Sequence, residues 1–150
     1  MVLNRQRRVA VEIAPLGRFV ERVRLELGFP ADGVAIQLVS DAAMKRLNWK
    51  FRKKRGSTDV LSFPARPRDG GGRAGRQGRT GEDGYVGDIA ISPEMARRNA
   101  RRDDRSLPDE LRILVLHGMI HLAGYDHETD RGQMHKLETA LRRRLGLLAR

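Results

Sequence analysis

Apolar residues recur along the chain at two spacings, and each spacing predicts a kind of secondary structure. Alternation of apolar and other side chains predicts four strands, at residues 9–13, 34–38, 60–64 and 85–91. Apolar positions three and four residues apart predict five helices, at residues 15–27, after residue 40, from 93, from 106 to about 123, and after 130. We therefore expect an α+β fold, with a small mixed four-stranded β-sheet packed with about five helices.

The helix expected between Ser106 and about Ala123 is apolar nearly all round, which is typical of a buried, central helix. His117 and His121 are polar exceptions on it, and residues four apart lie on one face of a helix. Gly124 offers a left-handed helix stop, after which a short turn can bring His127 back toward the other two histidines.

This histidine spacing, H-x-x-x-H-x-x-x-x-x-H, predicts a metal site. Three imidazoles with a fourth position open to water form a catalytic zinc site. Without a metal, each buried imidazole would need its own partner, because an unpaired buried polar group costs about 1–3 kcal/mol. We predict that His117, His121 and His127 bind one Zn²⁺ per chain, although three imidazoles also suit other divalent transition metals. His135 lies outside the pattern and is expected at the surface.

The same spacing occurs in metzincin peptidases, which read H-E-x-x-H-x-x-G-x-x-H and use the glutamate as general base. Here Gly118 occupies the glutamate position, so peptide hydrolysis is not favoured. A zinc-bound water still ionises near pH 7 without that glutamate. On a basic protein, a metal-activated water indicates attack on a phosphodiester.

Composition narrows the class of protein further. The 150 residues are predicted to form a single domain, with a net charge of +11 and no cysteine. The charge favours a polyanionic partner, most plausibly nucleic acid, or it reflects an arginine-biased proteome. No apolar run approaches the ~20 residues that span a bilayer, and no signal peptide is evident, so we expect a cytoplasmic protein without a membrane partner.

Two segments do not fit the periodic pattern. Residues 65–84 contain seven glycines and five arginines, which predicts a flexible loop that is either an RNA-binding arm or filler. The basic run at residues 49–55 includes two aromatic residues, Trp49 and Phe51. This run predicts either a grip on single-stranded RNA or a solvated helix end, and we expect both aromatics mainly in the core.

Residues 117–127 read H-G-M-I-H-L-A-G-Y-D-H and resemble the H-G-x-L-H-L-x-G-Y-D-H signature of the YbeY family. Residues 58–64, T-D-V-L-S-F-P, are similar to that family's T-D/N-V-L-S-F-P segment, and residues 87–89 fall at its G-D-I strand. Leu47-Asn48 and Phe51-Arg52 fit its L-N-x-x-[YF]-R stretch. The resemblance covers the chain from about Val34 to the last helix.

This resemblance implies a metal-dependent endoribonuclease that acts in 16S ribosomal RNA 3′-end maturation and ribosome quality control. It implies that His117, His121 and His127 are metal ligands, that His117 and Arg52 are catalytic, and that Arg52 holds a phosphate. Implied partners are single-stranded RNA, the ribosomal RNA precursor and the small ribosomal subunit, with a ribosomal protein or GTPase as further candidates. Ser57 stands where the family usually has proline, so we expect a looser turn.

Other residues have open assignments. Asp88 and Asp126 are candidates to orient a ligand histidine, or they stabilise turns. Candidate RNA-binding residues are Arg52, Lys53, Lys54 and Arg55. The rival functions are a non-catalytic, zinc-containing ribosome assembly or RNA-binding factor and, less favoured, a metzincin-like metallopeptidase.

Overall fold

The computed structural model describes residues 1–65, 84–126 and 129–147. Its elements, in chain order, are β1 (Val2–Asn4), α1 (Ile13–Leu27), β2 (Val34–Leu38), α2 (Asp41–Arg52), β3 (Val60–Pro64), β4 (Gly87–Ile91), α3 (Pro93–Arg102), α4 (Leu107–Leu122) and α5 (Gln133–Arg144). Nearly all of the loop predicted at residues 65–84, and the predicted ligand His127, lie outside the described residues.

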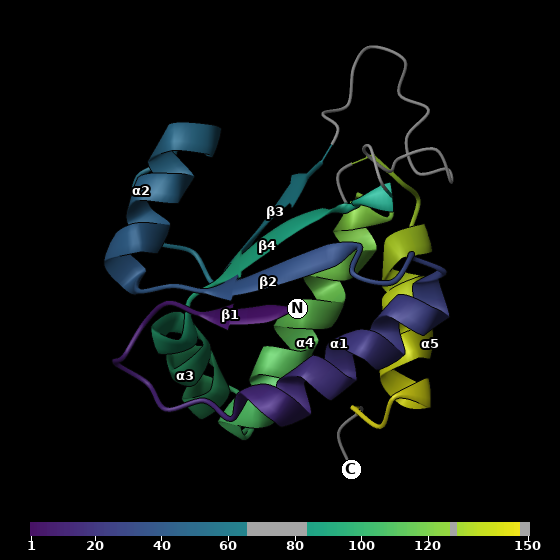
Figure 1. Ribbon diagram of the computed structural model, residues 1–150, viewed down its shortest axis with the longest axis horizontal. Coiled ribbons are helices and arrows are strands. Elements are labelled where there is room, and N and C mark those ends of the chain that lie inside the picture. The colour runs from purple at the N-terminus through teal and green to yellow at the C-terminus, as the bar shows by residue number, and fades with distance from the viewer. Residues whose placement is uncertain (66–83, 127–128, 148–150) are drawn as a thin grey trace.

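The described strands form a mixed four-stranded sheet, as predicted, and their order in the sheet is β1-β2-β4-β3 (Figure 1). β1, β2 and β4 are mutually parallel, and β3 runs antiparallel to β4 at the sheet edge. The register places Ile36 beside Ile89, and Ser62 beside Ile89 on its other side. The edge position of β3 matters for the site, because one side of this strand has no neighbouring strand in the described sheet.

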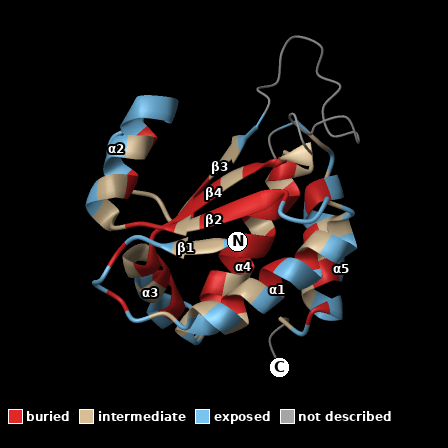
Figure 2. Ribbon diagram, viewed as in Figure 1, coloured by how far each residue is buried: buried red, intermediate tan, exposed pale blue. Residues whose placement is uncertain are grey.

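The two faces of the sheet are covered by different helices. Alternate residues of β2 and β4, such as Ile36 and Ile89, belong to a large apolar cluster with α1, α4 and α5. Leu61 and Ala90 point to the opposite face, where they pack in a smaller cluster with Met44 of α2. Helix α4 is the most enclosed helix in Figure 2, and it contacts α1, α3, α5, β3 and β4. The expectation of a central buried helix is confirmed.

The strand predicted at residues 9–13 is wrong. The backbone of Val9 bonds to a side chain instead of to a neighbouring strand. The Gln6 amide donates a 2.9 Å hydrogen bond to the Val9 carbonyl and accepts a 3.0 Å hydrogen bond from the Val9 N–H. Val2–Asn4 instead pairs with β2, and α1 begins at Ile13 rather than at Pro15.

The expectation that Trp49 and Phe51 lie in the core is also wrong. They are 51% and 55% exposed, and the buried residues of α2 are Met44 and Asn48. The ring of Phe51 meets that of Phe63 edge-on, with centroids 5.1 Å apart. No helix among the described residues is long and apolar enough to cross a membrane.

Candidate metal centre and cleft

Helix α4 carries His117 and His121, the two predicted metal ligands that lie within the described residues. Its first turn is capped by the Ser106 hydroxyl, which accepts a hydrogen bond of 3.2 Å from the backbone N–H of Asp109. The helix then continues without interruption through His117 and His121, which lie on one face. The long apolar sequence predicted this helix correctly.

Gly118 allows α4 to lie tightly against the sheet. A Cβ atom at this position would be 3.0 Å from two side-chain carbons of Ile89 and 3.3 Å from Oγ of Ser62. The Ser62 hydroxyl also donates a 3.0 Å hydrogen bond to the Gly118 carbonyl. A glutamate at position 118, which a metzincin needs, would collide with this packing.

The imidazoles of His117 and His121 point their Nε2 atoms toward each other at 3.2 Å. Nδ1 of His117 faces a Glu138 oxygen at 3.2 Å, and Nδ1 of His121 faces the Tyr125 carbonyl at 3.0 Å. Since a carboxylate and a carbonyl only accept hydrogen bonds, each Nδ1 is placed to donate its proton, which leaves each Nε2 as the atom available to a metal.

Two converging Nε2 lone pairs suit a shared cation. A tetrahedral zinc ion with Zn–N bonds of about 2.0–2.1 Å would separate two ligand nitrogens by roughly 3.3 Å. The observed separation of 3.2 Å is close to that value. The two histidines therefore fit the predicted metal, whereas His127 lies outside the described residues and stays a predicted third ligand.

Glu138 of α5 orients His117, a role that was not predicted from the sequence. Burial acts to raise the pKa of its carboxyl, but the hydrogen bond with His117 and the nearby Arg142 outweigh burial, and the pKa lies below its ordinary value. A signal was present, because Glu138 shares a helix face with the buried Met134 and Leu141. Arg142 is half-buried and donates a 3.2 Å hydrogen bond to Glu138.

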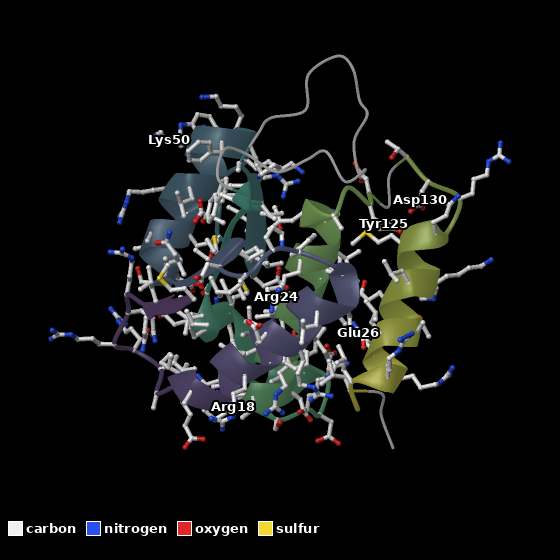
Figure 3. All side chains as sticks on the ribbon, turned by 45° about the vertical axis from the view of Figure 1, so that its right-hand side comes forward. Arg18, Arg24, Glu26, Lys50, Tyr125 and Asp130 are labelled. Atoms are coloured by element: carbon white, nitrogen blue, oxygen red, sulfur yellow. The ribbon has the colours of Figure 1, made fainter. Side chains whose placement is uncertain are left out.

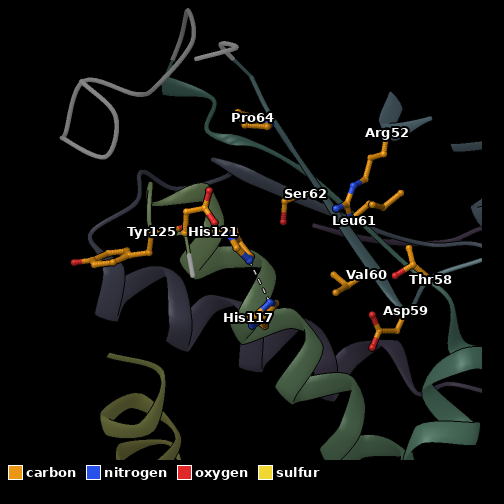
Figure 4. Close-up of a pocket in the computed structure, with 11 residues that line it drawn as sticks. Arg52, Thr58, Asp59, Val60, Leu61, Ser62, Pro64, His117, His121 and Tyr125 are labelled. Carbon is orange, nitrogen blue, oxygen red and sulfur yellow. Dashed lines mark hydrogen bonds between the residues drawn. The ribbon is translucent and has the colours of Figure 1, made fainter. Parts of the chain in front are cut away.

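The histidines form one wall of a cleft of about 490 Å³. Arg52 of α2 lies on the opposite side, above β3, and Ser62 lies between them (Figure 4). The cleft is lined by Arg52, Thr58, Asp59, Val60, Leu61, Ser62, Pro64, His117, His121, Tyr125 and Asp126. Thus the fold brings together the catalytic candidates Arg52 and His117, which are far apart in the sequence.

The open edge of β3 adds hydrogen-bond donors to the cleft. The Ser92 N–H donates to the Asp59 carbonyl, and the Ala65 N–H donates to the Val86 carbonyl. Backbone hydrogen bonding to the neighbouring strand alternates along an antiparallel strand. The backbone groups of the odd-numbered residues of β3 therefore bond to β4, and the N–H groups of Val60 and Ser62 point away from β4. Both residues line the cleft, so their N–H groups are suited to an anionic ligand.

The other predicted site residues have varied positions. Asp126 lines the cleft, but Asp88 does not, and it accepts a 2.5 Å hydrogen bond from the Tyr85 hydroxyl. Glu138 and the Tyr125 carbonyl occupy the orienting positions at the two described histidines, so orientation of His127 by either aspartate stays a prediction. The RNA-binding candidates Lys53, Lys54 and Arg55 are exposed, but the cleft does not include them, and His135 is at the surface as expected.

Asp41 holds the segment that leads into β3. Its carboxylate accepts hydrogen bonds from Ser92 at 2.6 Å, Ser57 at 3.1 Å and Arg98 at 2.7 Å. Ser57 is the residue that replaces the family's usual proline. The Ser57 hydroxyl bonds the turn to the start of α2, and the looser turn expected there stays a prediction.

Comparison with known proteins supports the same assignment. A family model described as Endoribonuclease YbeY matches residues 4–146. The chain belongs to the YbeY family. An Endoribonuclease YbeY of Koribacter versatilis is 40% identical over 147 residues, which cover 98% of this chain and 86% of the relative. That of Solibacter usitatus is 42% identical over 143 residues, covering 94% and 81%.

A solved structure extends the YbeY comparison to the fold. The solution structure of a Thermotoga maritima protein matches with a TM-score of 0.62 and 27% sequence identity. The match covers 97% of this chain and 89% of that protein. The family resemblance predicted from residues 117–127 is confirmed.

Proposed function

We propose that this protein is a metal-dependent, single-strand-specific endoribonuclease that acts in 16S ribosomal RNA 3′-end maturation and ribosome quality control. The observation that carries the proposal is the pair of Nε2 atoms on His117 and His121, which faces Arg52 across one cleft. The relatives' name, Endoribonuclease YbeY, supports the reaction class.

His117 and His121, with His127 as the third ligand, would hold one divalent ion, of which zinc suits three imidazoles. Such an ion supplies a Lewis acid and a water of lowered pKa. Glu138 keeps the His117 ring oriented with its Nε2 lone pair toward the ion site. Arg52 binds the scissile phosphate through its guanidinium fork and offsets the charge that develops there. The outward N–H groups of Val60 and Ser62 donate to phosphate oxygens of the same strand.

The substrate proposal rests on charge and family membership. The net charge of +11 attracts a nucleic-acid strand, and Lys53, Lys54 and Arg55 extend the positive surface beside Arg52. The proposed partners are the ribosomal RNA precursor and the small ribosomal subunit, in the cytoplasm, with a ribosomal protein or GTPase as recruiting partner.

Specific features disfavour the two rival functions. A structural zinc site is usually closed by four protein ligands, whereas the histidine pair opens onto a cleft of about 490 Å³. This arrangement disfavours a non-catalytic assembly factor. This chain also lacks the general base of a metallopeptidase, because Gly118 stands at the glutamate position. The packing of Gly118 on Ile89 leaves no room there for a glutamate side chain.

Cleavage of single-stranded RNA by the purified protein tests the proposal. The metal content is measured first, and cleavage is then followed with and without chelator for wild type and His117→Ala. Leu25→Ala, which removes an exposed side chain of α1, is the matched control. We expect chelation and His117→Ala to abolish cleavage and Leu25→Ala to leave it unchanged. Equal cleavage by all samples would contradict the proposal, and hydrolysis of a peptide instead of RNA would favour the peptidase.

A further inference from the structure

We propose that Trp49 is a stacking site for an RNA base, adjacent to the nucleotide whose phosphate Arg52 holds. This inference deepens the proposed function and rests on it for the identity of the strand in the cleft. The proposal gives a role to Trp49, which was expected in the core but is exposed in the structure.

The position of Trp49 on α2 supports this role. Trp49 and Arg52 are three residues apart, so their side chains lie next to each other on the helix surface. Arg52 lines the cleft, and the Trp49 ring is 51% exposed beside it. A strand bound by Arg52 in the cleft would therefore meet an exposed indole ring as it leaves. Base stacking on such a face is tolerant of sequence and requires an unpaired base.

The charges around Trp49 match a nucleotide rather than an apolar ligand. The Lys53 ammonium lies 5.7 Å from the centroid of the Trp49 ring. Lys50 projects from the outer end of α2, and its ammonium lies 5.3 Å from the Phe51 centroid (Figure 3). An exposed aromatic ring with a flexible lysine cation over it offers stacking for a base and a counter-charge for its phosphate. A protein partner that buried this surface would instead have to desolvate the lysines.

Phe51 is a contrasting case on the same helix. It is as exposed as Trp49, but it is two residues away and thus projects from a different side of the helix. Its ring rests edge-on against Phe63, which gives it a structural contact. We therefore assign the stacking role to Trp49 alone.

The chain offers a direct probe, because Trp49 is its only tryptophan. Its intrinsic fluorescence is titrated with short oligoadenylate RNA, with an abasic strand of equal length, and with blunt RNA duplex. We expect saturable quenching with oligoadenylate and little with the abasic strand or the duplex, since only free bases stack. Equal quenching by abasic and normal strands would overturn the proposal.

Affinity is measured separately with labelled oligoadenylate, for Trp49→Leu, Trp49→Phe and the control Leu25→Ala. Loss of one stacked base should weaken binding about 5- to 150-fold in Trp49→Leu. Trp49→Phe should recover most of the affinity, and Leu25→Ala should equal wild type. Unchanged affinity in Trp49→Leu would overturn the stacking site, even if binding to ribosomal subunits fell, because the surface would then serve a protein.

These measurements do not require cleavage. Quenching with no detectable cleavage would count against the endoribonuclease and leave the stacking site supported. Cleavage without base-dependent quenching would support the endoribonuclease and count against the stacking site.

Discussion

Glu138 accepts a hydrogen bond from Nδ1 of His117, 21 residues earlier in the chain, over 3.2 Å. The bond connects α5 to α4 at the point where the histidine pair faces the cleft. The other carboxylate oxygen of Glu138 is held by Arg142, also at 3.2 Å. The last helix thus fixes the ring orientation and the tautomer of the first histidine, a role that carboxylates commonly play behind metal ligands.

Replacing Glu138 should weaken metal binding without unfolding the protein. Glu138→Gln keeps the shape of the side chain but removes the charge that makes the His117 ring a stronger ligand. We expect a loss of metal affinity of about 10- to 100-fold. The measurement is a competition titration against a chromophoric chelator, with the fold checked by circular dichroism. Glu26→Gln is the matched control. Glu26 of α1 forms an ion pair of 3.1 Å with Arg144 of α5, the helix that carries Glu138. Equal metal affinity in both variants would contradict the role of Glu138.

Arg52 should contribute more to cleavage than the neighbouring basic residues. A guanidinium binds a phosphate through two parallel hydrogen bonds, which a lysine ammonium does not reproduce. We expect Arg52→Lys to reduce the turnover number about 10²- to 10³-fold, as removal of a transition-state donor does. Arg55→Ala is the control, since Arg55 is exposed and does not line the cleft. If Arg52→Lys and Arg55→Ala reduce turnover equally, Arg52 supplies only general positive charge.

Two glycines in helices should respond oppositely to alanine. At Gly118 the new methyl group would be 3.0 Å from Ile89, and overpacking of this kind costs about 1–3 kcal/mol. At Gly17 of α1, a Cβ atom would meet no heavy atom within 4 Å. There the gain in helix propensity should stabilise the protein by about 1 kcal/mol.

Urea unfolding of wild type, Gly118→Ala and Gly17→Ala measures both effects. Destabilisation by Gly118→Ala and stabilisation by Gly17→Ala are the expected results. If Gly118→Ala is as stabilising as Gly17→Ala, then tight packing of α4 is not the reason for glycine at this position.

The features predicted correctly from the sequence are those set by local patterns. Ser40, Ser92 and Ser106 each accept a hydrogen bond from a backbone N–H in the first turn of the following helix, as capping residues do. The pair of His117 and His121 follows from helix geometry alone. The strands β2, β3 and β4 also follow from the alternating apolar segments, whereas β1 does not.

The features that were missed depend on contacts between distant segments. Gln6 satisfies the backbone of Val9 through its side chain, and apolar alternation contains no information about that bond. The exposure of Trp49 depends on where the sheet ends. Glu138 was overlooked because a glutamate on an apolar helix face acquires its meaning only from His117, which belongs to another helix.

The cluster around Asp41 should make stability depend on pH in the acid range. Burial acts to raise the pKa of the Asp41 carboxyl, but hydrogen bonds from Ser92, Arg98 and Ser57 outweigh it, and the pKa lies below its ordinary value. A carboxyl with a lower pKa in the folded than in the unfolded protein stabilises the fold above the unfolded-state pKa, about 3.9. That contribution is lost as the pH falls through the folded-state pKa.

Asp41→Asn should therefore destabilise the protein at pH 7 by about 1–3 kcal/mol, the contribution of hydrogen bonds to a charged group. The difference from wild type should shrink as the pH falls below about 4, because the carboxyl is protonated first in the unfolded protein and, at still lower pH, in the folded protein. Urea unfolding across this pH range measures the difference. Glu12→Gln is the control, since Glu12 is exposed and its side chain makes no capping hydrogen bond to α1. A difference between Asp41→Asn and wild type that stays constant with pH would mean that the charge of Asp41 does not hold the turn at Ser57.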